Sequence, residues 1–196
     1  SNNPMTYETL RADNTNATYT IPHGVGAVWA GILWDMTWDL IAINGFNPDI
    51  YDSNGVEGNI IALNLVVEGL KLTSCNPGFI DGRDAILQAD DVLYGNGVAG
   101  SGTGANQCAI WGAFSRRGLG VGANQGNTNN TSDGSHSYVN PAACTPDYLL
   151  TIGGPTEACE GASLDFEMVF NAQNGFNTAT GFTASCLPGC AVVTFS

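Results

Sequence analysis

Apolar residues recur at every third or fourth position in the first part of the chain, which predicts helices that each bury one face. The most regular run follows Pro22, which suits a first helical position, and ends at Asn44 and Gly45. The same rhythm predicts helices near 58–72, from 76 to 94 and near 105–117, the last one stopping at Gly118. The predicted buried stripes are Val25, Trp29, Ile32, Leu33, Met36, Leu40 and Ile43 in the first helix, and Ile60, Leu63, Val67 and Leu70 in the second.

Trp34 and Trp38 widen the apolar stripe of the first helix. We therefore expect this helix to be covered on most sides, with Asp35 and Asp39 on the face opposite the stripe. The tryptophans lie at helical spacing, which favours a place in the core over a sugar-binding platform. They are Trp29, Trp34, Trp38 and Trp111.

The last part of the chain alternates between apolar and polar residues, which is typical of a half-buried strand. The clearest strand contains Leu164, Phe166, Met168 and Phe170, and an earlier one contains Tyr148, Leu150 and Ile152. Two later strands are predicted around Phe182 and Ala184 and around Val193 and Phe195. An immunoglobulin-like sandwich needs about seven strands, so a sandwich built from these is incomplete.

The change of rhythm predicts an α+β chain with more than one domain. Residues 1–122 form an all-helical lobe, and residues 144–196 form a small antiparallel module of the β-sandwich kind. Between them, residues 123–143 are rich in Gly, Asn, Ser and Thr and have no periodicity, which predicts a flexible linker.

The charge balance excludes two classes of partner. Eighteen acidic residues face five basic ones, a formal net charge of −13, so binding to nucleic acid or to an anionic membrane surface is not expected. No apolar run reaches the ~18 residues of a membrane span. Only 12% of the residues are charged, against about 25% in ordinary domains, which indicates a secreted, extracellular protein. No signal peptide opens the chain, so we expect any targeting segment to have been removed.

The six cysteines indicate disulfides rather than a metal site, because no CxxC pair and no paired histidines occur. They are Cys75, Cys108, Cys144, Cys159, Cys186 and Cys190. Sequence alone does not fix the pairing. Proximity in the sequence favours a bond between Cys75 and Cys108, with the other four cysteines paired among themselves.

Few residues carry candidate chemistry. His23 begins the first helix, and either a solvated first-turn role or a functional one fits it; His136 is expected to be solvated in the linker. Asp81, Arg83 and Asp84 predict a local ion-pair cluster. Carboxylates and an amide between 49 and 57 could supply calcium ligands, but they do not match an EF-hand, so an ordinary acidic loop is favoured. These loop residues are Asp49, Asp52, Asn54 and Glu57.

Three segments carry a family resemblance. They read HGVGAVWAGILWDMTWDLI, VVEGLKLTSCNPGFIDGRDAILQADDVLYG and CAIWGAFSRRGLGVGA. Together, over about residues 1–122, they resemble the C-terminal helical lobe of fungalysin-type zinc metallopeptidases, which are thermolysin-like. Residues 145–196 resemble the start of the immunoglobulin-like module that follows such catalytic domains in secreted bacterial proteins.

The resemblance implies that this chain forms one wall of the substrate cleft of a zinc endopeptidase. The zinc ligands of the family, HExxH and a downstream glutamate, do not occur here, so no zinc is expected in this chain and the chain alone should be inactive. By the resemblance, His23 stabilises the tetrahedral oxyanion in the complete enzyme. Ala27 stands where family members often have Glu, which leaves a non-catalytic relative open.

The expected partner is the zinc-bearing segment of the peptidase, or further copies of this chain, with a peptide or protein as substrate. The alternative function is a non-catalytic extracellular subunit that self-associates, and could form fibres, through unpaired strand edges.

Overall fold

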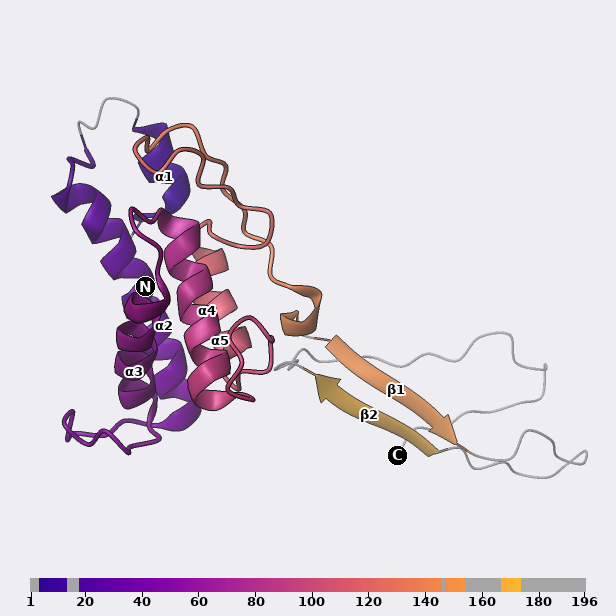
Figure 1. Cartoon of the computed structure of the whole chain (residues 1–196). Helices are drawn as coiled ribbons and strands as arrows, with labels where there is room; N and C mark the ends of the chain where they lie inside the picture. The colour runs from indigo at the N-terminus through magenta and orange to yellow at the C-terminus, as the bar shows by residue number, and fades with distance from the viewer. Residues whose placement is uncertain (1–3, 14–17, 146, 154–166, 174–196) are drawn as a thin grey trace, which may run out of the picture. The chain divides into compact units, whose positions relative to one another are not determined.

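The computed structural model describes residues 4–13, 18–145, 147–153 and 167–173. The chain divides into two units, Ser1–Thr145 and Pro146–Ser196, which are considered separately below. The first unit is helical (Figure 1). Its elements are α1 (Tyr7–Ala12), α2 (His23–Asn44), α3 (Gly58–Leu72), α4 (Phe79–Tyr94), α5 (Gln107–Arg116) and the short 3-10 helix η1 (Ala142–Cys144).

The four predicted long helices are confirmed. Helix α2 starts directly after Pro22 and ends at Gly45, whose φ of 78° favours glycine. Helix α3 has the predicted bounds, and α5 ends just before Gly118, whose φ is 88°. Helix α1 was not predicted, because its six residues are too few for a periodic pattern.

The core lies where α2 crosses α3 and α5, with α3 also packed on α4. The buried stripe of α2 is Val28, Ile32, Met36 and Leu40. Gly58, at the start of α3, allows the closest approach: an added Cβ would lie 2.1 Å from the carbonyl carbon of Leu40. The start of α3 can therefore lie directly against the backbone of α2.

Part of each predicted apolar surface is exposed, which corrects the sequence interpretation, although Ile32, Met36, Leu40 and Ile60 are buried as predicted. Trp34 and Trp38 are 58% and 53% exposed, so α2 is covered on one side only. On α3 the outward residues are Leu63, Val67 and Leu70, at 49%, 57% and 70%. Most residues of both helices are apolar, so periodicity alone does not identify every buried position.

The segment 123–143 is not a flexible linker, because it packs on the helical unit. Asn124 and Ser135 exchange backbone hydrogen bonds of 2.8 and 2.7 Å, and Gly120 donates to Ser137 at 2.7 Å. The Tyr7 hydroxyl donates to the Asn124 carbonyl at 3.3 Å, which attaches the segment to α1. Polar composition predicted mobility, but backbone pairing and contacts with distant residues hold this segment in place.

The predicted disulfide pairing is also wrong. Cys108 in α5 bonds Cys144 in η1, and Cys75 is exposed and unbonded in the part of the chain that the structure describes. The reason is again the folded 123–143 segment, since it returns Cys144 to α5. Cys159, Cys186 and Cys190 lie outside the described residues.

The described part of the second unit is an antiparallel pair of strands, β1 (Asp147–Gly153) and β2 (Glu167–Gln173). The register places Leu150 opposite Phe170. The strands predicted at Tyr148, Leu150 and Ile152 and at Met168 and Phe170 are confirmed, while Leu164 and Phe166 of the predicted second strand lie outside the described residues. The strands predicted around Phe182 and Val193 lie outside the described residues, and the immunoglobulin-like module stays a prediction.

Candidate functional site

His23 is the first residue of α2 and is exposed, as the sequence predicted for its position. The turn before it is fixed by Asp13, whose carboxylate accepts backbone hydrogen bonds from Thr18 at 2.8 Å and Tyr19 at 2.6 Å. Gly24 donates to the Thr20 carbonyl at 2.7 Å, and a Cβ on Gly24 would lie 2.6 Å from the Tyr19 backbone. The imidazole is therefore carried on the end of a rigid helix rather than on a loose loop.

His23 begins a line of uncharged residues along the outer side of α2, which we call the α2 stripe. Spacings of four and three place its members on one helix face. None of them is buried, and Ala30, Trp34 and Trp38 are exposed. The indole rings of Trp34 and Trp38 meet edge to face at 5.8 Å. The α2 stripe consists of His23, Ala27, Ala30, Trp34 and Trp38.

Two arginines at the end of α5 set the rotation of α2 about its axis. Arg117 donates through Nε to Asp35 at 2.7 Å, and both side chains are largely buried. Arg116 pairs with Asp39 at 2.5 Å in a more exposed position. Asp35 and Asp39, which were predicted on the face opposite the apolar stripe, thus face the arginines at the end of α5, and the α2 stripe faces outward.

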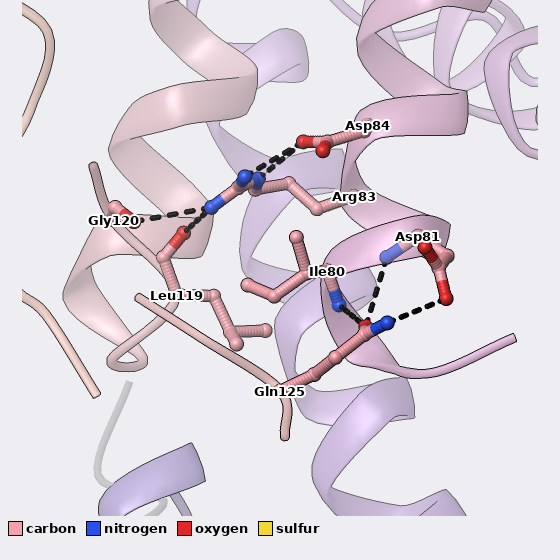
Figure 2. A network of polar contacts seen from close by, with 7 residues as sticks. All are labelled: Ile80, Asp81, Arg83, Asp84, Leu119, Gly120 and Gln125. Carbon is pink, nitrogen blue, oxygen red and sulfur yellow. Dashed lines mark hydrogen bonds and ion pairs between the residues drawn. The ribbon is translucent and has the colours of Figure 1, made fainter. Parts of the chain in front are cut away.

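The beginning of α4 is capped by a residue from far along the chain (Figure 2). The Gln125 Oε1 atom accepts the backbone N–H of Ile80 at 2.8 Å and of Asp81 at 3.1 Å. Its Nε2 donates to Asp81 at 2.6 Å, while Asp81 also accepts from the Gly78 N–H at 2.9 Å. Gly78 has no side chain with which to cap the helix, and a Cβ there would lie 2.4 Å from Gln125 Oε1. The amide therefore takes the place of an ordinary N-cap.

Arg83 holds the chain after α5 against α4 (Figure 2). It donates through Nη1 to the Leu119 carbonyl at 2.9 Å and the Gly120 carbonyl at 3.1 Å. Its guanidinium lies 4.5 Å from the ring centre of Trp111, and its ion pair with Asp84 measures 2.7 Å. The predicted Arg83–Asp84 pair is confirmed, whereas Asp81 joins Gln125 rather than this cluster.

Two adjacent buried carboxylates, Asp90 and Asp91, hold the glycine-rich loop after α4. Burial raises the pKa of Asp90 above its usual value, although Asn106 and Gln107 donate hydrogen bonds to it. Burial also opposes ionisation of Asp91, but the backbone N–H groups of Gly102 and Gly104 outweigh it and lower the pKa of Asp91. The two carboxylates therefore organise the loop by accepting hydrogen bonds from its backbone N–H groups and from Asn106.

His136 is not the free, solvated histidine that the sequence predicted. Arg11 lies 3.2 Å from its Nδ1 and can only donate, so Nδ1 accepts and Nε2 carries the proton. Nε2 lies 3.6 Å from Glu8, which also accepts a hydrogen bond from the Tyr138 hydroxyl at 2.5 Å. His136 thus helps to join the 123–143 segment to α1.

The acidic loop before α3 is organised by hydrogen bonds. Asn47 donates through Nδ2 to Asp52 at 3.4 Å and to Glu57 at 3.1 Å, and Asp49 accepts from the Tyr51 N–H at 3.0 Å. Across the described residues, no group of three or more His, Cys, Asp or Glu side chains could hold a metal ion. The described residues therefore do not fit a zinc site, and the expectation that residues outside this chain hold zinc stays a prediction.

Sequence reasoning missed the structural partners of the site because they act over long distances. Gln125 caps a helix that begins more than forty residues earlier, and nothing around it marks it as a cap. For Arg117 a weak signal exists, since two consecutive arginines follow an apolar helix in an acidic chain. None of the described helices is both long and apolar enough to cross a membrane.

Comparisons with a family model and with individual proteins indicate the same family. The family model described as "Fungalysin metallopeptidase (M36)" matches residues 1–123. The chain is 40% identical over 133 residues to "Extracellular metalloproteinase MEP" of Neosartorya fischeri, covering 66% of this chain and 19% of that protein. It is 41% identical over 126 residues to the protein of the same name in Pyricularia oryzae, covering 62% of this chain and 18% of that one.

The chain thus spans about a fifth of the length of these relatives. They carry the word extracellular in their names, and this chain, which contains a disulfide, is extracellular as its composition predicted. The matched residues include α1 to α5 and the whole α2 stripe. The chain belongs to the fungalysin (M36) family of metallopeptidases.

Proposed function

We propose that the helical unit is the lobe of an extracellular zinc endopeptidase that forms one wall of its substrate cleft. The α2 stripe would dock against the zinc-bearing part of the enzyme, and His23, at its end, would face the cleft. The observation that carries this proposal is the uncharged α2 stripe, which starts at a histidine and leaves two tryptophans in water. Docking would remove both indole rings from water, a gain of about 2 kcal/mol or more for each large ring.

In this proposal His23 donates a hydrogen bond to the peptide carbonyl oxygen as that oxygen gains negative charge. Such a donor acts only as charge develops, so it raises the rate without tightening substrate binding. The fixed turn before α2 supports this role because Asp13 and Gly24 hold the start of the helix in one position. Zinc would be supplied by the other part of the enzyme.

Complementation tests the proposal. The full chain is mixed with the zinc-bearing remainder of an M36 peptidase, and complex formation and casein cleavage are measured. We expect a stable complex and peptidase activity, both lost in Trp34→Glu. Val98→Glu is the matched control, because it adds the same charge at a loop position that is also exposed. Equal complex formation by the two variants would contradict docking through α2.

His23→Gln separates docking from chemistry. The variant should form the complex normally while kcat falls by about 10²–10³ with little change in KM. An unchanged kcat would remove the catalytic role of His23, whereas a complex that forms but cleaves no casein would favour the non-catalytic relative that Ala27 leaves open. The self-associating subunit expected as an alternative stays a prediction, and sedimentation of the chain alone tests it.

A further inference from the structure

A cavity of about 260 Å³ lies between α4, the start of α5 and the glycine-rich loop that joins these two helices. Its volume is just below the ~300–1,000 Å³ of ordinary small-ligand sites, so it suits a single side chain better than a cofactor. All of its lining residues belong to α4, α5 or the loop, so it is separate from the α2 stripe. The side chains that line it are those of Asp84, Leu87, Gln88, Asp91, Gln107 and Trp111.

The buried carboxylate of Asp91 fixes the loop side of this cavity. It accepts backbone hydrogen bonds from Gly102 at 3.0 Å and from Gly104 at 2.9 Å. Burial opposes its ionisation, but the backbone hydrogen bonds outweigh burial and lower the pKa, so Asp91 is negatively charged at neutral pH. The loop wall is therefore formed without a ligand, and an occupant would need little rearrangement.

The lining is acidic and leaves one negative charge for a ligand. Asp84 and Asp91 belong to it, whereas no Lys or Arg of the described residues does. Arg83 offsets the charge of Asp84, but its Nε and Nη2 both bond the same oxygen, Oδ1, at 2.8 and 2.7 Å (Figure 2). The Asp84 side chain is 44% exposed, and its Oδ2 has no partner among the described residues. Such a lining attracts a cation, and the net charge of −13 on the whole chain adds to that attraction.

Three side chains of the lining each have an acceptor oxygen available for an incoming donor: Asp84, Gln88 and Gln107. Gln107 donates through Nε2 to the Leu87 carbonyl at 2.9 Å, which leaves its Oε1 to accept. Gln88 has no hydrogen-bond partner within the part of the chain that the structure describes. A primary ammonium group has three N–H donors and no acceptor, so it matches this set of oxygens.

Leu87 and Trp111 supply the apolar part of the lining. The guanidinium of Arg83 lies 4.5 Å from the centre of the Trp111 ring and so helps to hold the indole in place. A lysine side chain packs its methylene groups on apolar surface while its charged end reaches polar groups. We propose that this cavity binds a primary alkylammonium group, namely the side chain of a lysine in a peptide or protein that contacts this chain. The inference goes beyond the proposed function, because it requires neither zinc nor His23.

The experiment is an NMR titration of the full chain with N-acetyl-lysinamide, followed at the backbone amides of Gly100 and Gly102, which also line the cavity. N-acetyl-norleucinamide, which has an alkyl chain without the charge, and methyl glucoside are the comparison probes. We expect saturable shifts with the lysine probe alone. Asp84→Asn should raise its Kd at least about fivefold, because the ammonium group loses a charged acceptor. Asp52→Asn is the matched control, since it removes the same charge at an exposed position outside the cavity, and it should leave the Kd unchanged.

Equal binding of the norleucine probe, tighter binding of methyl glucoside, or shifts that do not saturate would each overturn the proposal. So would an equal weakening in Asp84→Asn and Asp52→Asn, since that result would indicate general attraction to an acidic chain.

Adding the zinc-bearing remainder of the peptidase distinguishes the two sources of the lysine. Probe binding that persists in the complex supports a lysine of a substrate, whereas displacement of the probe as the complex forms supports a lysine of the remainder itself. If complementation fails while the lysine probe still binds at Gly100 and Gly102, the ligand class stands and the proposed peptidase role is what fails.

Discussion

Two neighbouring residues of α4 show how strongly nearby hydrogen-bond donors influence the pKa of a buried carboxylic acid. Asp90 and Asp91 are both almost fully buried, yet the pKa of the first is raised by burial and that of the second is lowered by backbone N–H groups. Because a pKa that differs between folded and unfolded states makes stability depend on pH, the two residues should have opposite effects.

Asp91→Asn should lower the free energy of unfolding by about 1–3 kcal/mol at pH 7, because the backbone donors lose a charged acceptor. The pKa of Asp91 is depressed on folding, so its contribution is present above the unfolded value of about 3.9 and is lost as the pH falls below it. The difference in unfolding free energy between wild type and variant should therefore become smaller on acidification. Urea unfolding between pH 3 and 7 measures this difference.

Asp90→Asn is the contrasting variant. Since the pKa of Asp90 is raised on folding, the wild type loses stability as the pH rises from about 4 through that raised pKa, and the variant does not. The unfolding free energy of the variant should therefore increase relative to that of the wild type as the pH rises. Slopes of the same sign for both variants would contradict the assigned pKa directions.

Glycine substitutions test the close approach of helices α2 and α3. Gly58→Ala should lower the unfolding free energy by about 1–3 kcal/mol, because the new Cβ would overlap the Leu40 backbone and force the helices apart. Gly112→Ala has room and should raise the unfolding free energy by up to about 1 kcal/mol. Equal effects in thermal unfolding would show that helix propensity, not packing, decides both.

At the scale of elements, periodicity predicted where the long helices lie and most of the buried side of α2, but not the outward side of α3. Helix α2 has apolar residues on nearly every side, so its rotation is decided by Asp35 and Asp39 pairing with arginines some eighty residues later. Those pairs have no local signal. The position of His23 at a helix start could be predicted. The turn before it depends on Asp13, and the cap of α4 depends on the 123–143 segment, whose polar composition resembles that of a linker.

Gln125→Ala tests the long-range cap of α4. The N–H groups of Ile80 and Asp81 would lose their acceptor, so we expect the unfolding free energy to fall by about 1–2 kcal/mol. Hydrogen exchange at these two amides should accelerate. Asn129→Ala is the control, since this exposed side chain belongs to the same segment. Unchanged exchange at Ile80 and Asp81 would refute the cap.

For the whole molecule, the disulfide closes the helical unit just before the boundary at Thr145. Replacing both Cys108 and Cys144 by Ser should lower the unfolding free energy by about 4 kcal/mol for a loop of this length. Cys75→Ser should have no comparable effect, because Cys75 is not bonded to Cys108. Peptide mapping without reduction should recover a peptide that joins Cys108 to Cys144; a Cys75–Cys108 peptide would contradict the structure.

The same bond also determines how the protein responds to mechanical load. Tension applied from the C-terminal unit enters the helical unit at Cys144 and passes through the sulfur bridge into α5. The backbone between the two cysteines, 36 residues in sequence, is thus bypassed, which hides about 120 Å of extendable chain. The 123–143 segment, held mainly by hydrogen bonds, is shielded from peeling while the bridge is intact. In single-molecule stretching, a reducing agent should lengthen the unfolding step by that hidden amount.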